Sequence, residues 1–196
     1  LAPVNDVRIG GARFGVAVGD LNARIDLNRS DPETVHSFFR QFTSDQQARV
    51  IAASLQAKPL ERIGELASLP GVTDALALAV APYVTVRGDG IVNINSAPEP
   101  VLAALPGLGA AAARSIVERR ASGEVFAPSA SAQQPRGTQV VIASAPPDVL
   151  VLTEPSRLLI IARGWQEGSP LTHEIQAVYS IVGSRLMLQG WQERDL

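Results

Sequence analysis

The residues best suited to chemistry in this chain are the turn formed by Pro106, Gly107, Leu108 and Gly109 and the helix expected after it. Residues 91–120 have the pattern of a short strand, a capped helix, a tight turn and a second helix, which is typical of a helix-hairpin-helix unit. Glycines at such a turn free backbone N–H groups at a helix N-terminus, where they can hold a phosphate oxygen. The turn and Arg114 are therefore the candidate contacts to a DNA backbone.

The residues around this turn favour a scaffold role over DNA binding. Hairpins that bind DNA usually carry Lys or Arg directly after the turn, but here Ala110–Ala113 precede the first charge. A related turn at Pro70-Gly71 is followed by Asp74, an acid placed where a phosphate would sit. The net charge of -2 gives no whole-chain signal for nucleic acid either. We therefore do not expect nucleic acid as a partner.

Four acidic residues close in sequence form a second candidate site: Asp20, Asp26, Asp31 and Glu33. Their carboxylates are suited to calcium. The spacing matches no EF-hand loop, however, and Asp31 and Glu33 also suit the start of a helix, where acids complement its dipole. We expect no cofactor, with calcium at these residues as the alternative.

No pattern in the chain indicates an enzyme. Its two histidines, His36 and His173, have no ligand-like neighbours, and cysteine is absent. The sequence contains no Gly-x-Ser-x-Gly, no phosphate-binding loop and no His-Glu-x-x-His.

Strand patterns dominate both ends of the chain, and helix patterns dominate its middle. Residues 12–18 and 22–27 alternate in hydropathy and predict a hairpin through Gly19-Asp20. Helices are expected from Ser30 or Asp31 onward, with another cap at Ser44 and a further one at Asn95 or Ser96. Two short strands at 83–86 and 91–94 should be joined through Gly88-Asp89-Gly90. Residues 157–163, 171–182 and 185–191 predict an antiparallel meander, with a turn at Gly183-Ser184.

Two pairs of segments resemble each other inside the helical part. LASLPGV at 66–72 resembles LAALPGL at 102–108, and IDLNRSDPE at 25–33 resembles VNINSAPE at 92–99. The repetition predicts two related helical hairpins that cover each other's apolar faces.

These patterns predict an α+β fold. Residues 1–29 should provide the first part of an antiparallel sheet, and residues 30–126 an inserted helical subdomain. Residues 127–138, rich in Pro, Ser and Gln, are expected to be a linker, and residues 139–196 to complete the sheet.

Several segments together resemble the K-type minor pseudopilins of bacterial type II secretion systems. The matching segments are DLNARIDLN at 20–28, KPLERIGEL at 58–66, PYVTV at 82–86 and NINSAP at 93–98. The resemblance covers roughly residues 16–120. It implies a pilin-like sheet with a large helical insertion containing helix-hairpin-helix-like units.

The resemblance also implies a function and a location. Such proteins act in protein secretion at the tip of the pseudopilus, where they initiate and cap the fibre. Their partners are I-type and J-type minor pseudopilins, and secreted substrates are further candidates. They lie at the periplasmic face of the inner membrane, held by an apolar N-terminal helix that is absent from this sequence. Residues 93–120 are equally similar to periplasmic competence DNA receptors, so a helix-hairpin-helix DNA-binding module is the alternative.

Overall fold

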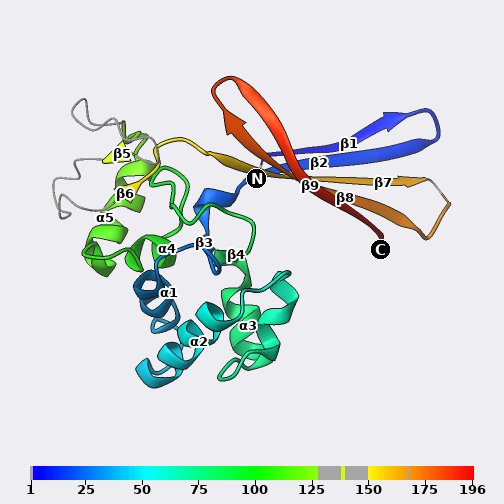
Figure 1. Ribbon diagram of the computed structural model, residues 1–196. Helices are drawn as coiled ribbons and strands as arrows, with labels where there is room; N and C mark the ends of the chain where they lie inside the picture. Colours follow the sequence, from blue (N-terminus) through cyan, green and yellow to red (C-terminus); the bar gives the residue numbers. More distant parts are fainter. Residues whose placement is uncertain (1, 128–137, 140–149, 167) are drawn as a thin grey trace. The chain divides into compact units, whose positions relative to one another are not determined.

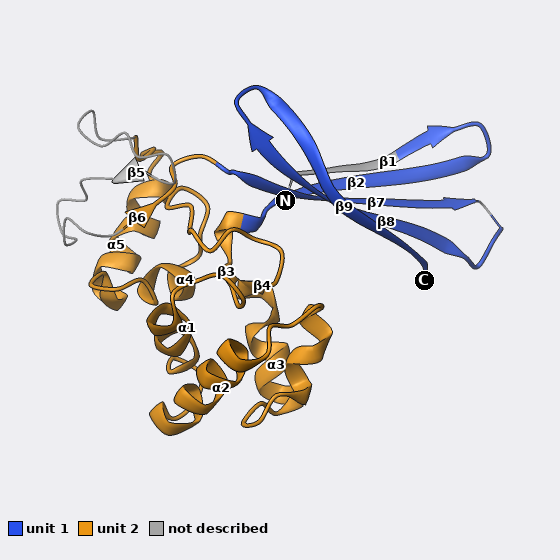
Figure 2. Cartoon of the chain, in the orientation of Figure 1, with its two compact units in different colours: residues 1–21, 155–196 blue, residues 22–154 orange. Residues whose placement is uncertain are grey.

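The computed structural model describes the chain except for residues 1, 128–137, 140–149 and 167 (Figure 1). The chain divides into two compact units, one formed by residues 1–21 and 155–196 and the other by residues 22–154 (Figure 2). We call them the sheet unit and the helical unit. Their limits differ from the boundaries expected at 30 and 126, because short strands on both sides of the helices group with the helical unit. The expected linker at 127–138 lies mostly outside the described residues.

The sheet unit is a five-stranded antiparallel sheet with strand order β1-β2-β7-β8-β9 among the residues that the structure describes. Its strands are β1 (Ala2–Ile9), β2 (Ala12–Asp20), β7 (Arg157–Gln166), β8 (Thr172–Val182) and β9 (Arg185–Asp195). The predicted meander near the C-terminus is confirmed, and so is the turn at Gly183-Ser184, where Gly183 has a φ of 60°.

The predicted hairpin between residues 12–18 and 22–27 is wrong. Strand β2 pairs with β1 through a turn at Gly10-Gly11, and with β7 on its other side. Residues Leu21–Ala23 form a 3-10 turn (η1) instead, and β3 (Ile25–Asp26) belongs to the helical unit. The alternating hydropathy at 22–27 is not that of a sheet strand, because Ile25 and Leu27 are apolar for another reason. Both are buried in the core of the helical unit.

The helical unit surrounds a continuous apolar core that includes Phe38, Phe39, Ile51, Leu102 and Ile116. Its helices are α1 (Pro32–Phe39), α2 (Asp45–Ala57), α3 (Asp74–Val80), α4 (Glu99–Ala103) and α5 (Gly109–Ala121), with 3-10 turns η2 (Ile63–Ser68) and η3 (Ala81–Tyr83). Short strands β4 (Val84–Thr85), β5 (Thr138–Gln139) and β6 (Leu150–Val151) complete it.

Side-chain caps start α1 and α2 where the sequence places them. The Asp31 carboxylate accepts the backbone N–H of Glu33, and the Ser44 hydroxyl accepts the backbone N–H of Gln47. The expected cap at Asn95 or Ser96 is wrong, because α4 begins after Pro98 without a side-chain cap. The side chain of Asn95 is used in a longer-range contact.

An internal duplication organises the helical unit. The Asn28 side chain hydrogen-bonds both the N–H and the C=O of Leu60, and the Asn95 side chain bonds the N–H and C=O of Phe126 in the same way. Before each asparagine, a turn is closed by the side chain of Asp26 or Asn93, which accepts a backbone N–H two residues later. Each asparagine thus ties the entry of a helical hairpin to the segment that leaves it.

The parallel backbone pairing is duplicated as well. The N–H of Leu27 donates to the carbonyl of Thr85, and the N–H of Ile94 donates to the carbonyl of Leu152. The expected strand pair at 83–86 and 91–94 is therefore wrong. Strand β4 pairs in parallel with β3, and Asn93 forms an isolated parallel bridge with Leu152.

The LPG segments share a local geometry within this framework. Leu69 and Leu105 each donate to the carbonyl three residues earlier, and Val72 and Leu108 do the same. Gly71 and Gly107 have φ values of 83° and 76°. The first turn connects η2 to α3, however, while the second connects α4 to α5. The two turns are alike in conformation but occupy different places in the repeat.

Candidate functional site

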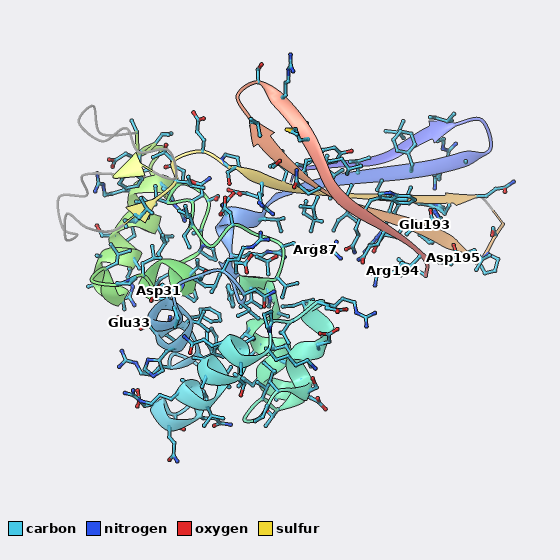
Figure 3. All side chains as sticks on the ribbon, viewed as in Figure 1. Asp31, Glu33, Arg87, Glu193, Arg194 and Asp195 are labelled. Carbon is cyan, nitrogen blue, oxygen red and sulfur yellow. The ribbon has the colours of Figure 1, made fainter. Side chains whose placement is uncertain are left out.

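The four candidate calcium ligands have separate structural roles. Asp31 caps α1, and Glu33 lies in the first turn of the same helix (Figure 3). Asp26 is buried in β3, where its Oδ1 accepts the N–H groups of Asn28 and Arg29. Burial raises the pKa of Asp26, although those N–H groups and the charge of Arg29 oppose the shift. Asp20 ends β2 in the sheet unit.

The geometry therefore does not bring these residues together as a calcium site. Among the described residues, no group of three or more His, Asp or Glu side chains is placed to hold a metal ion. Calcium at this position stays a prediction from sequence that the structure does not support.

The candidate DNA hairpin is formed as expected, with a tight turn from Pro106 to Gly109 between α4 and α5. Helix α5 starts at Gly109 without a side-chain cap and without an acid in its first turn. Arg114, however, lies one turn into the helix and pairs with Glu99 at 3.4 Å. The positive charge nearest the turn is thus compensated within the hairpin itself.

A groove of about 460 Å³ runs beside this turn, between α1 and the α4–α5 connection. Glu33 and Arg40 line it together with Gly107 and Gly109, so its charges are mixed. A groove with both signs of charge does not provide the positive field that a phosphate backbone requires.

The sheet unit carries a more distinctive surface, because one face of its sheet is apolar. The strand register places Val16, Ile160, Ala177 and other apolar side chains on the same side. Six large apolar residues of this side are exposed: Ile9, Val18, Ile175, Leu186, Leu188 and Trp191. Trp191 is 57% exposed. We call this surface the apolar face. Exposed apolar surface of this extent marks a binding surface in a globular protein.

An ionic cluster lies at one end of the apolar face. His173 Nδ1 lies 2.8 Å from Asp195 Oδ1, and His173 Nε2 lies 3.5 Å from Glu193 Oε2. The hydrogen bond to Asp195 is the main reason that the pKa of His173 is raised above its ordinary value.

The opposite face of the sheet mixes polar side chains with apolar ones such as Trp165 and Val178, and it holds a buried carboxylate. Glu174 is 0% exposed and accepts hydrogen bonds from Arg163, Arg194 and Gln176 at 2.6 to 2.9 Å. Burial alone would raise the pKa of Glu174, but these hydrogen bonds outweigh it, so the pKa is lowered.

Sequence reasoning missed the apolar face as a surface. The alternation in β8 was recognisable, but it did not reveal which residues of β1, β2, β7 and β9 lie beside it. The side of the sheet on which each apolar residue lies is determined once the strand register is known.

The fold defines an α+β protein in which an antiparallel sheet is interrupted by a helical insertion, as predicted. The architecture is similar to a solved structure described as the GspK-GspI-GspJ complex from enterotoxigenic Escherichia coli Type 2 Secretion System. The TM-score is 0.63 at 13% sequence identity, and the match covers 97% of this chain and 82% of that chain. No curated protein matches the sequence.

The family model described as Type II secretion system (T2SS), protein K matches residues 92–153. These residues correspond to the second copy of the duplicated framework, from Val92 to Leu152. The predicted resemblance to the K-type minor pseudopilins is therefore confirmed. In the part of the chain that the structure describes, no helix is long and apolar enough to cross a membrane.

Proposed function

We propose that this chain is the tip subunit of a type II secretion pseudopilus, where it initiates and caps the fibre together with I-type and J-type minor pseudopilins. The observation that carries the proposal is the apolar face, which a free globular protein would not leave in water. The match to the protein K family and the similarity to a GspK-containing complex support the same role.

The dimensions of the apolar face suit an α-helix lying along the strands. Strands β8 and β9 have 11 residues each. At about 3.3 Å per residue they extend roughly 35 Å. A helix of about 24 residues has the same length. An apolar helix upstream of this sequence would cover the face and hold the protein at the periplasmic side of the inner membrane.

The helical unit supplies the capping mechanism. Residues 22–154 are inserted between β2 and β7, two neighbouring strands of the sheet. A further subunit that packed against a fibre subunit with such an insertion would clash with the inserted residues. We infer that it blocks addition of another subunit, so the protein ends the fibre instead of extending it.

Complex formation in solution tests this function. Soluble I-type and J-type pseudopilins mixed with this chain at micromolar concentration should elute together from a size-exclusion column as a ternary complex. Three separate peaks at every ratio would argue strongly against the tip role. A gel-shift assay with DNA at low salt provides the comparison with the DNA-binding alternative, for which we expect no shift.

Cysteine labelling tests whether the apolar face is covered. Because the chain contains no cysteine, W191C and Q192C introduce single thiols at adjacent positions on opposite faces of β9. In protein that carries its upstream helix in membranes, maleimide should react slowly with the W191C thiol and quickly with the Q192C thiol. In the chain described here both should react quickly. Equal reactivity of the two thiols in membranes would refute the helix position.

A further inference from the structure

Strand β9 forms an edge of the sheet, and the first half of that edge is unprotected. In the described part of the chain, β9 pairs with β8 alone. Edge strands of soluble proteins usually carry charged side chains, prolines or bulges that prevent pairing with another chain. The second half of β9 has such protection, because a bulge follows Leu188 and the strand ends in Glu193, Arg194 and Asp195. Residues 186–188 contain no charge, no proline and no bulge.

The side chains of this stretch are uncovered on both faces of the sheet. Leu186 and Leu188 belong to the apolar face and are 55% and 52% exposed. Met187 lies on the opposite face and is 51% exposed. A helix on the apolar face would cover the two leucines, but neither Met187 nor the backbone at the edge. A neighbouring strand, in contrast, contacts side chains on both faces.

The backbone of the same stretch is directed to the outside of the sheet. The N–H of Ile181 donates to the carbonyl of Ser156 at 2.8 Å, so it points away from β9. Ile181 and its partner Leu186 therefore form a pair of the non-hydrogen-bonded kind. The N–H and C=O of Leu186 consequently point to the free edge, and alternation along the strand gives the same direction for Leu188.

We propose that two copies of this chain pair in an antiparallel way through residues 185–189 of β9, with the twofold axis at Met187. The sequence Leu186-Met187-Leu188 is the same in both directions, as a twofold interface requires. Leu186 lies opposite Leu188 of the second copy and exchanges backbone hydrogen bonds with it. Met187 lies opposite Met187 of the second copy.

The charges of β9 select this register. It places Arg185 opposite Gln189, so no two charged side chains face each other across the interface. A register with Leu188 opposite Trp191 would instead place Arg185 opposite Arg194, and like charges in that position are destabilising. A shift of one residue would put the apolar faces of the two copies on opposite sides.

The contact is small, so the dimer should be transient. About five residues from each copy take part, whereas stable interfaces contain roughly 20–30 residues a side. The two sheets join edge to edge, and the apolar face continues from one copy to the other. The proposal does not rest on the function proposed above, because a helix on the apolar face leaves the edge of β9 free.

Disulfide cross-linking tests the proposal on the whole chain, which contains no cysteine. Cα atoms in a non-hydrogen-bonded pair lie about 4.5 Å apart, a distance that a disulfide can span. Under mild oxidation Met187→Cys should form a disulfide-linked dimer at least about tenfold faster than Val182→Cys. Val182 is the matched control, because it lies on the same face as Met187, is 57% exposed and is on β8, away from the axis.

Sedimentation equilibrium measures the contact without a covalent bond. The wild-type chain should associate reversibly at about 0.5 mM. Met187→Lys should raise the dissociation constant of the dimer at least about tenfold, because it places two like charges at the axis. Leu171→Lys, at a position that is 60% exposed outside β9, should leave it unchanged.

Two results would overturn the proposal. Equal rates of disulfide formation in Met187→Cys and Val182→Cys would show that the thiols meet by random collision. Faster cross-linking of Trp191→Cys than of Met187→Cys would show that the copies associate through their apolar faces and not through the edge of β9.

Discussion

Replacement of Asn95 by alanine should destabilise the helical unit more than replacement of Asn28. The Asn95 amide donates to the carbonyl oxygens of Phe126 and Thr153, both at 2.8 Å, and its Oδ1 accepts the N–H of Phe126 at 2.9 Å. A half-buried hydrogen bond of this kind contributes about 0.5–1.5 kcal/mol net. Three such bonds predict a loss of about 2–4 kcal/mol.

The duplicated framework supplies an internal comparison. Asn28 makes two equivalent bonds, to the N–H and C=O of Leu60, at 2.9 and 2.8 Å. Asn28→Ala should therefore cost about 1–3 kcal/mol, less than Asn95→Ala. Gln189 is exposed on β9, and Gln189→Ala should change the free energy of unfolding by no more than about 0.5 kcal/mol.

Urea unfolding followed by circular dichroism at the helix band measures these losses. Both tryptophans, Trp165 and Trp191, lie in the sheet unit, so their fluorescence reports the sheet separately. Hydrogen exchange at the Phe126 amide should accelerate in Asn95→Ala, because Asn95 is the acceptor of that N–H. A free energy of unfolding within about 0.5 kcal/mol of the wild type, or unchanged exchange at Phe126, would refute the role assigned to Asn95.

Three further outcomes are expected. Gly90→Ala should lower the free energy of unfolding by more than about 2 kcal/mol. The reason is that Gly90 has a φ of 89° and an added Cβ would lie 2.4 Å from the Arg29 carbonyl oxygen. Thermal melts measure the loss, with Gly64→Ala as the control, because a Cβ at Gly64 would have nothing within 4 Å. The lowered pKa of Glu174 means that its ionised form stabilises the fold at neutral pH, and that this stability is lost as pH falls through the folded-state pKa. In Glu174→Gln the free energy of unfolding should therefore fall less steeply as the pH is lowered. The raised pKa of His173 has the opposite effect: its contribution to stability is present at low pH and is lost as pH rises through the folded-state pKa. Asp195→Asn should lower the pKa of His173, as measured by an NMR titration.

A specific result would contradict each of these three predictions. Equal melting of the Gly90 and Gly64 variants would show that the loop at 88–90 can move away from Arg29. If the free energy of unfolding of Glu174→Gln depends on low pH as in the wild type, the ion pairs of Glu174 do not contribute net stability. An unchanged His173 titration in Asp195→Asn would assign the shift to Glu193 instead.

Local chemistry was readable from the sequence. The caps at Asp31 and Ser44, the LPG turns and the C-terminal meander all depend on residues within a few positions of each other, and the structure has them where the patterns placed them. The α+β class followed from the same patterns. The prediction of a strand at 22–27 was wrong because alternating apolar residues suit the core of a helical unit as well as a sheet.

Long-range pairing was decided by the tertiary structure. The sequence shows that Asn28 and Asn95 are similar, but it does not show that their amides bind backbone groups more than 30 residues away, at Leu60 and Phe126.

The sequence by itself determined the fold class, the starts of α1 and α2, the LPG turns, the turn at Gly183-Ser184 and the resemblance to the K-type pseudopilins, because each rests on local residue types and spacing. Among the described residues, the tertiary structure does not gather the calcium candidates into a metal-holding group, and it pairs β2 with β1 and β7. It also decided which apolar residues of the five strands share the apolar face. Register is the physical reason, since a shift of one residue in any strand would exchange the two faces.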